Sequence, residues 1–229
     1  MTTLKPMSPN PIRSFVRRDS RLTRAQRVAL EQNWDRYELS KCSSAAELAE
    51  EFSADAPVTL EIGSGDGTCL LELARRSPNE NFLAVEVYRP GLGRLLHRAA
   101  ESNLSNIRVS DQDIWDFLPP GSEPLFERIL IFFPDPWPKK RHHKRRLLQE
   151  GFFNLIESRL HRHGRLFIAT DSASYAQSIL ETLETLPRWI NLAGDGRPSP
   201  RAKFRATTKF ERKALDAGST IIDFVLARR

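Results

Sequence analysis

The sequence predicts an α/β fold built on a mostly parallel sheet with helices on both faces. From Val58 onward, short β-rich runs alternate with stretches of helical apolar spacing, which is typical of βαβ units. The 229 residues are 40% hydrophobic and 28% charged, which is enough apolar material for one substantial core. We therefore expect one domain of ordinary size with an amino-terminal extension.

The expected strands and helices alternate along the chain. Six strands are expected, at residues 58–62, 82–87, 107–110, 129–133, 166–170 and 220–227. The apolar faces of the intervening helices are formed, in chain order, by Leu70, Leu71, Leu73 and Ala74; by Leu92, Leu95, Leu96 and Ala99; by Leu147, Leu148, Phe152, Leu155 and Ile156; and by Tyr175, Ile179, Leu180, Leu183 and Leu186. Residues 194–206 are rich in Gly, Pro and Arg, and we expect a functional loop there.

The chain before the first strand is basic. Between Arg13 and Lys41 it carries eight Lys or Arg residues against four acids, with weak apolar periodicity. We expect residues 1–57 to form a basic arm and a lead-in helix, with the arm mobile until a ligand binds it, and residues 58–229 to form the main domain. A net charge of +6 and a pI near 9.6 favour a polyanionic partner if the cations are clustered.

Composition also excludes several classes of protein. Cys42 and Cys69 lack metal-like spacing, so neither a disulfide scaffold nor a structural zinc site is expected. No apolar run approaches the roughly 18 residues of a membrane span, and the amino terminus has no signal-peptide core. A soluble cytoplasmic protein without a metal or a membrane partner is expected, as a monomer or a homodimer.

A glycine loop follows the first expected strand and opens the first expected helix. Its sequence is Glu61-Ile62-Gly63-Ser64-Gly65-Asp66-Gly67. Glycines in this position let a ligand approach the backbone closely. A dinucleotide fingerprint spaces its third glycine three residues after the second, whereas here Gly65 and Gly67 are two apart and an acid ends the strand. This spacing favours S-adenosylmethionine over NAD.

Two more acids follow the next strands. Glu86 ends the second strand, where a carboxylate can accept both ribose hydroxyls of an adenosine. Asp113 follows the third strand, within reach of the adenine. Together with Glu61 they are expected to form one ligand-binding edge. The alternative is a structural glycine turn with solvated acids.

A proline-rich loop follows the fourth expected strand. It reads Pro134-Asp135-Pro136-Trp137-Pro138 and places Asp135 at the carboxyl end of a buried strand. Three prolines stiffen the loop, which suits a pocket for a planar base. The alternative is a proline-rich turn whose Trp137 packs on the core.

Basic residues continue from this loop. Every residue from Lys139 to Arg146 is Lys, Arg or His, and this run can hold substrate phosphates beside a reacting base. A solvated face or a localisation signal is the alternative, and adjacent His142 and His143 make a poor metal site. A further basic cluster contains Arg197, Arg201, Lys203, Arg205, Lys209, Arg212 and Lys213 around one acid, Glu211.

One more acid stands at a strand end. Asp171 closes the fifth expected strand and is expected on the same edge of the sheet as the other acids. Its alternative role is to cap the helix that starts near Ser172.

These segments together closely resemble the bacterial tRNA (guanine-N7)-methyltransferase family. The similarity runs in order from about Ile12 to Phe224 and includes the arm residues 14–18; its motifs are residues 60–67, 85–87, 90–93, 132–137, 169–171 and 208–211. The Phe-Phe-Pro-Asp-Pro-Trp loop followed by basic residues is highly specific. The resemblance implies a Rossmann-like class I methyltransferase fold, S-adenosylmethionine as methyl donor, and a guanine in the tRNA variable loop as target.

The resemblance also implies roles for individual residues. Glu61, Glu86 and Asp113 would bind the cofactor, together with Gly63 and Gly65 of the glycine loop. Asp135 would be the catalytic or base-binding acid. The substrate contacts implied are Lys139, Asp171, Thr208, Lys209, Phe210 and Glu211.

Guanine N7 bears no proton, so it can attack a sulfonium methyl group without a general base, and positioning supplies most of the catalysis. A fixed carboxylate near the purine stabilises the positive charge that develops there, and Asp135 is the candidate. Asp135, Asp171 or Glu211 could also select guanine by accepting from N1–H and N2–H. Two other functions remain as alternatives, a nicotinamide-dependent oxidoreductase and a non-enzymatic RNA-binding protein.

Overall fold

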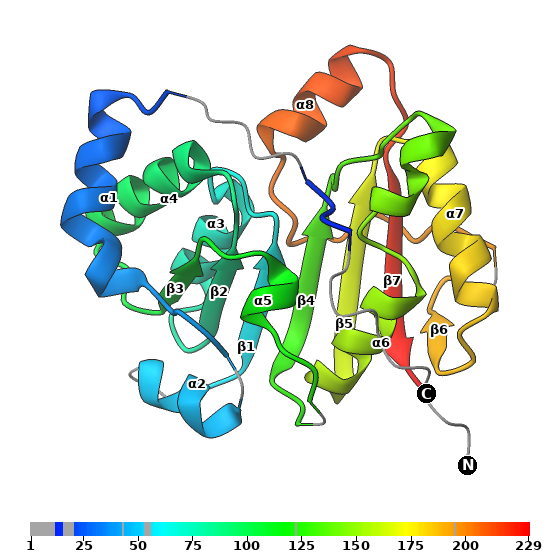
Figure 1. Cartoon of the computed structure of the whole chain (residues 1–229), viewed down its shortest axis with the longest axis horizontal. Coiled ribbons are helices and arrows are strands. Elements are labelled where there is room, and N and C mark those ends of the chain that lie inside the picture. Colours follow the sequence, from blue (N-terminus) through cyan, green and yellow to red (C-terminus); the bar gives the residue numbers. More distant parts are fainter. Residues whose placement is uncertain (1–11, 16–20, 43, 53–55, 122, 195) are drawn as a thin grey trace.

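The structure is a computed structural model that describes residues 12–15, 21–42, 44–52, 56–121, 123–194 and 196–229. Its strands are β1 (Val58–Ile62), β2 (Asn81–Val85), β3 (Ile107–Ser110), β4 (Phe126–Phe132), β5 (Leu160–Thr170), β6 (Trp189–Asn191) and β7 (Ile222–Arg228). Within the described residues they form one seven-stranded sheet in the order β3-β2-β1-β4-β5-β7-β6 (Figure 1). Strands β1 to β5 are mutually parallel, which confirms the predicted mostly parallel sheet.

The ends of several strands differ from the prediction. β4 stops at Phe132 because Phe133 adopts a left-handed conformation with φ 56°. β5 begins at Leu160, well before the expected start, because the exposed polar residues near its beginning conceal the strand pattern. The three-residue β6 was not predicted, and β7 pairs antiparallel with both β5 and β6.

Helices cover both faces of the sheet, as predicted. One buried cluster joins β1, β4 and β5 to α2 (Ala45–Glu51), α5 (Ile114–Phe117), α6 (Glu150–Arg159) and α7 (Ala173–Glu184). The other joins the sheet to α1 (Arg24–Tyr37), α3 (Thr68–Arg76) and α4 (Arg89–Glu101). Along β4 the side chains alternate between the clusters: Ile129 and Ile131 belong to the first, whereas Leu130 and Phe132 belong to the second.

Part of the segment expected to be a mobile arm is an ordered helix. Thr23 and Gln26 form a capping box at the start of α1, in which each side chain accepts from the other residue's backbone N–H. The Gln26 side chain also donates to the carbonyl of Pro90, 3.1 Å away. A Cβ on Gly93 would lie 2.9 Å from the Gln26 carbonyl, so α1 and α4 pack backbone against backbone. Residues 24–37 therefore form a helix within the segment where an arm and a lead-in helix were expected, rather than part of a mobile arm, and Arg17 and Arg18 lie outside the described residues.

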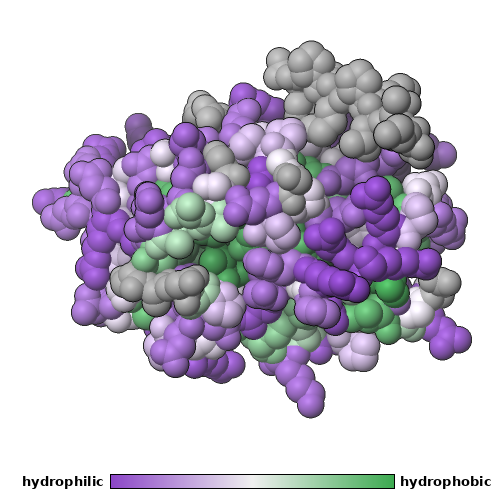
Figure 2. Space-filling view, turned by 90° about the horizontal axis from the view of Figure 1, so that it is seen from below, coloured by the Kyte–Doolittle hydropathy of each residue, from purple (hydrophilic) through white to green (hydrophobic). Residues whose placement is uncertain are grey.

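The carboxyl ends of β1 to β5 share one edge of the sheet, and α8 (Lys209–Asp216) lies above this edge in Figure 1. The opposite edge, seen in Figure 2, is mostly hydrophilic, with smaller hydrophobic areas between the polar side chains. Two hollows of about 290 and 310 Å³ lie there, and both are lined by Pro57 and Glu127. Neither is lined by a predicted site residue. Within the described part of the chain, no helix is both long and apolar enough to cross a membrane.

Candidate active site

The glycine loop forms the first part of the site. After β1 the chain turns through Gly63 and Gly65, whose φ angles of 76° and 59° lie in the left-handed region that side chains disfavour. The loop then enters α3 at Thr68. A Cβ on Gly91 would lie 2.4 Å from the Gly65 carbonyl oxygen, so the start of α4 packs directly against the backbone of the loop. Gly91 belongs to the motif at residues 90–93, but its supporting role could not be read from the sequence.

Glu61 is the buried acid of this loop. It lies within β1 and is 3% exposed, and its Oε2 atom has no hydrogen-bond partner among the described residues. Burial raises the pKa of Glu61 to about 8, although a hydrogen bond from the backbone of Leu70 opposes this change. A buried carboxyl with an unpartnered oxygen is suited to bind a cationic ligand group.

Glu86 braces the glycine loop. It follows β2 directly; its Oε2 accepts from the Gly65 backbone N–H and its Oε1 from the Tyr88 N–H, both at 2.7 Å. Burial raises the pKa of Glu86, and these backbone hydrogen bonds act in the opposite direction. Each carboxylate oxygen retains a second acceptor site, so Glu86 can hold the loop and still accept a ligand hydroxyl.

Asp113 lies beyond the end of β3. It is the N-cap residue of α5, where its Oδ1 accepts from the Trp115 backbone N–H at 3.1 Å. Its side chain is buried. The three predicted cofactor acids therefore follow or end three adjacent strands at the same edge of the sheet.

The loop after β4 is held in an unfavourable backbone conformation. Phe133 and Trp137 have φ angles of 56° and 46°, although neither is glycine. Left-handed conformations of this kind cost of order 1–3 kcal/mol each and persist where surrounding contacts hold them. The two residues flank Asp135, which is exposed and whose charge contributes to raising the pKa values of Glu86 and Tyr175. Asp135 is therefore near enough to Glu86 and to Tyr175 of α7 for its charge to act on both.

Arg146 supplies much of that support. Its Nε donates to the carbonyl of Pro136 at 2.9 Å, and its Nη1 donates to the hydroxyl of Ser178 at 2.8 Å. The guanidinium also lies 4.9 Å from the ring centroid of Tyr175. Arg146 is almost fully buried, so the expectation that the whole basic run can reach substrate phosphates is wrong for this residue. Its fork of donors instead ties the proline loop to α7.

The rest of the basic run is accessible. It forms the short 3-10 helix η1 (Lys140–Arg145), which follows Lys139. The exposed cations are Lys139, Lys140, Arg141 and Lys144. Arg145 lies 4.9 Å from the Trp137 ring centroid, and the Trp137 indole donates to the Ser14 carbonyl at 2.9 Å. The alternative in which Trp137 packs on the core is therefore wrong, because this ring is covered by a cation and contacts the amino-terminal segment.

Asp171 lies directly after β5 and is exposed. The hydroxyl of Ser172 accepts from the Tyr175 backbone N–H, so Ser172 is the N-cap residue of α7. The alternative in which Asp171 serves only as this cap is therefore wrong.

The start of α8 reaches over the glycine loop. Thr208 is its N-cap and accepts from the Glu211 backbone N–H at 3.2 Å, while Lys209 points to solvent. Phe210 is 65% exposed, and its Cε2 atom lies 3.8 Å from the place of a Cβ on Gly65. The motif at residues 208–211 and the glycine loop therefore meet, although they are far apart in the sequence.

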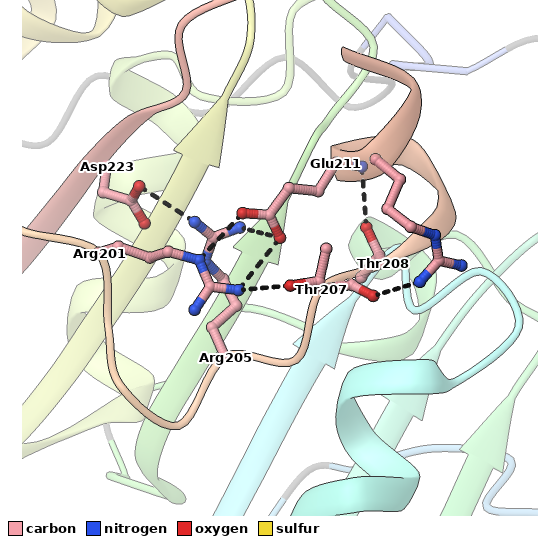
Figure 3. A network of polar contacts seen from close by, with 7 residues as sticks. Arg201, Arg205, Thr207, Thr208, Glu211 and Asp223 are labelled. Carbon is pink, nitrogen blue, oxygen red and sulfur yellow. Dashed lines mark hydrogen bonds and ion pairs between the residues drawn. The ribbon is translucent and has the colours of Figure 1, made fainter. Parts of the chain in front are cut away.

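Glu211 differs from its neighbours in the motif. It is 2% exposed, and its carboxylate forms ion pairs of 3.0 Å with both Arg201 and Arg205 (Figure 3). Arg205 also pairs with Asp223 of β7 at 3.1 Å. The side chain of Glu211 is therefore engaged inside the protein, whereas Asp135 and Asp171 are exposed. Arg205, which sequence reasoning counted with the surface cations, is a buried structural residue.

Known proteins resemble this chain along most of its length. A family described as "Putative methyltransferase" matches residues 55–224. A tRNA (guanine-N(7)-)-methyltransferase of Nitrosococcus oceani is 42% identical over 221 residues, which are 96% of this chain and 92% of that protein. A protein of the same name from Halorhodospira halophila is 42% identical over 225 residues, which are 96% of each chain.

Solved structures show the same fold at low sequence identity. The 16S rRNA methyltransferase KamB has a TM-score of 0.57 at 15% identity, over 82% of this chain and 94% of its own. TrmN from Thermus thermophilus has a TM-score of 0.52 at 18% identity, over 89% of this chain and 48% of its own. The predicted Rossmann-like class I fold is therefore confirmed.

Proposed function

The chain belongs to the tRNA (guanine-N7)-methyltransferase family, and from this premise we propose how its residues transfer a methyl group from S-adenosylmethionine to N7 of a guanine in the tRNA variable loop. One observation carries the assignment of roles. The acids Glu61 and Glu86, the loop that holds Asp135 and the start of α8 converge at one edge of the sheet, with Phe210 against Gly65. Cofactor and base can therefore meet there.

The residues at this edge fit S-adenosylmethionine. The unpartnered Oε2 of Glu61 is available to a cationic group, and the cofactor carries both an ammonium and a sulfonium. Beyond its two chain neighbours, no atom of the described residues lies within 4 Å of the place of a Cβ on Gly63, so a ligand can approach the loop backbone closely there. Gly65 lies between Glu86 and Phe210. Glu86 would accept the ribose hydroxyls and Asp113 would contact the adenine. When bound, the cofactor supplies an electrophilic methyl group.

Cofactor binding is expected to depend on pH through Glu61. With its pKa near 8, Glu61 is mostly protonated at pH 6.5, and a cationic ligand beside it favours the ionised form. Binding should therefore release a proton, and affinity should rise by up to about tenfold per pH unit as the pH approaches 8 and level off above it. Calorimetry between pH 6 and 7.5, in buffers of different ionisation enthalpy, measures both effects.

Glu61→Gln provides the matched control for this experiment, because it keeps the shape and cannot ionise. Between pH 6 and 7.5 the cofactor's α-amine is mostly protonated before it binds, so proton release seen in wild type and absent from Glu61→Gln comes from Glu61. Equal proton release by wild type and Glu61→Gln would show that Glu61 does not face the cofactor cation.

Glu86→Ala should weaken S-adenosylmethionine binding by about 10- to 100-fold, because hydrogen bonds to a charged group are worth about 1.5–3 kcal/mol. The variant also releases the Gly65 and Tyr88 N–H groups that Glu86 holds. Glu86→Gln keeps one acceptor oxygen, so its affinity for S-adenosylmethionine should fall less than that of Glu86→Ala. Calorimetric titration measures the cofactor affinity of each variant, and tRNA affinity, which should not change, serves as the reference. Unchanged cofactor affinity in Glu86→Ala would contradict the assignment.

For the transfer step, we assign Asp135 the role of stabilising the purine. Guanine N7 has an in-plane lone pair and no proton, so the protein needs no general base. Positive charge grows on the purine as the methyl group moves, and a fixed carboxylate favours that state over the ground state. The strained Phe133 and Trp137 positions and the Arg146 brace support this role, because they hold the Asp135 loop in one conformation.

The substrate surface extends on both sides of Asp135. Lys139 and the exposed cations of η1 would hold tRNA phosphates, Asp171 would contact the guanine edge, and Phe210 would contact a base. Thr208 and Lys209 would contact the RNA at the start of α8. Glu211 would act on the substrate indirectly, by holding α8 in place.

Methylation of unmodified tRNA with labelled cofactor tests the proposal. Nucleoside mass spectrometry should identify 7-methylguanosine, and fragment mapping should place it in the variable loop. Methylation of another atom would refute the N7 assignment, and binding of tRNA without methyl transfer would favour an RNA-binding protein. Sedimentation of the same sample distinguishes a monomer from a homodimer, and the tRNA substrate makes the cytoplasm the expected location.

A further inference from the structure

The ion-pair network beneath α8 lies between two parts of the proposed site, the start of α8 and the loop that carries Asp135. Arg205 lies at its centre and is 2% exposed. Its Nη1 contacts Oε2 of Glu211 at 3.0 Å and its Nη2 contacts Oδ2 of Asp223 at 3.1 Å, which joins α8 to β7 (Figure 3). Arg201 closes the network through Oε1 of Glu211. Two arginines balance two carboxylates.

The same guanidinium also contacts the loop that carries Asp135. Its central carbon lies 5.4 Å from the ring centroid of Phe132 and 5.7 Å from that of Phe133. Both distances are within the range of cation–π attraction. Phe133 is the left-handed residue that ends β4 and starts the Pro134-Asp135 turn. Arg205 therefore packs against the residue that sets the direction of this loop.

We propose that Arg205 is a positioning residue, which fixes the position of the Asp135 loop relative to the substrate-binding start of α8. This inference rests on the proposed function, because the two parts matter together only if a base enters between them. The fork of the guanidinium reaches both carboxylates while its plane contacts the aromatic rings, and a lysine ammonium has no such plane.

The chemistry of the network explains why one residue can couple these parts. Glu211 lies in α8 and Asp223 in β7, two elements joined by residues 217–221, and Arg205 forms an ion pair with the carboxylate of each. Removing Arg205 would leave Asp223 without its ion pair and Glu211 with Arg201 alone. An uncompensated buried carboxylate draws in water or moves toward solvent, and α8 would move with it.

Arg205→Ala should lower the single-turnover rate at saturating cofactor and tRNA by about 10- to 100-fold, the scale that a misplacement of about 1 Å can produce. Affinity for tRNA should also fall, whereas affinity for S-adenosylmethionine should stay within about twofold of wild type. A rate within about twofold of wild type once tRNA saturates would show that Arg205 holds only α8, and would overturn the coupling.

Arg159→Ala is the matched control. Arg159 is also a buried arginine, 1% exposed, but it donates to the backbone carbonyls of Pro119 and Glu123, away from the site. Its loss should lower thermal stability and leave the saturated rate within about twofold of wild type at a temperature where both variants are folded. An equal loss of rate in both variants would mean that general destabilisation explains the effect.

A spectroscopic measurement tests the coupling without any methyl transfer. The indole N–H of Trp137, at the end of the Asp135 loop, gives an NMR cross-peak that Trp137→Phe identifies. Arg205→Ala should shift this cross-peak and leave that of Trp34 on α1 unchanged, while Arg159→Ala should move neither. An unmoved Trp137 cross-peak would overturn the inference, whereas failure of wild type to methylate tRNA would overturn only the proposed function.

Two further variants cover the case in which Arg205→Ala does not fold. Arg205→Lys keeps the charge but cannot hold both carboxylates and the rings, and Asp223→Asn leaves the Arg205–Glu211 pair in place. Both should retain cooperative unfolding and lower the saturated rate by more than about threefold, with the larger loss in Arg205→Lys. Wild-type rates in both would refute the proposal.

Discussion

Asp135→Asn is expected to slow single-turnover methyl transfer by about 10²-fold or more, the scale of losing one preorganised electrostatic partner in a transition state. The substitution keeps the shape of the side chain and removes its charge. As the methyl group moves, the cofactor loses its positive charge and the purine acquires one. A neutral amide therefore stabilises the transition state less than a carboxylate does. Rapid-quench kinetics with saturating cofactor and unmodified tRNA measure the effect.

Cofactor affinity should change little in this variant, because Glu61, Glu86 and Asp113 are intact. Since N7 needs no deprotonation, added formate should act only by occupying the vacated site, and imidazole should give no new base-dependent rate. Asp216→Asn, which removes an exposed charge at the end of α8, is the matched control and should behave as wild type. A rate within about twofold of wild type for Asp135→Asn would direct attention to Asp171.

Replacing the four exposed cations of the basic run with alanine should weaken tRNA binding by about 10²-fold near physiological salt, because each phosphate contact releases counterions. These cations are Lys139, Lys140, Arg141 and Lys144. The slope of log affinity against log salt should fall by about 3 units, since each lost contact removes roughly 0.7–0.9. Filter binding over a range of salt concentrations gives both quantities.

The control removes four exposed arginines from the opposite edge of the sheet, namely Arg75, Arg76, Arg162 and Arg188. It changes the net charge by the same amount and should leave the slope nearly unchanged. Weaker binding with an unchanged slope in the first variant would mean that the basic run acts through structure. Arg146 stays in both variants, because its loss would release the proline loop from α7.

Most of the fold could be predicted because its signals are local. Period-two and helical apolar patterns identify a strand or a helix within a few residues, and each acid that follows a strand reaches the carboxyl edge of a parallel sheet. For this reason Glu61, Glu86, Asp113 and Asp135 could be placed before any contact was known. Strand β6 has only three residues, which is too short for a periodic signal.

The roles of the charged residues could not be predicted in the same way, because a cation has the same sequence signature whether water or a distant carboxylate surrounds it. Arg146 and Arg205 stand in clusters that resemble surface patches, yet both are buried. The partners that decide this are distant in the chain: Ser178 is 32 residues from Arg146, and Asp223 is 18 from Arg205. The same is true of α1, whose Gln26 contacts Pro90 across 64 residues.

The sequence by itself determined the order of the longer strands and the helices between them, the glycine loop and the set of acids at the carboxyl edge, because these follow from patterns within single βαβ units. Tertiary structure alone decided which cations are exposed, that Glu211 is paired with two arginines, and that Phe210 lies against Gly65. The physical reason is that burial and ion pairing depend on which distant segments pack together. Trp137 and Ser14, 123 residues apart, are joined only by the fold.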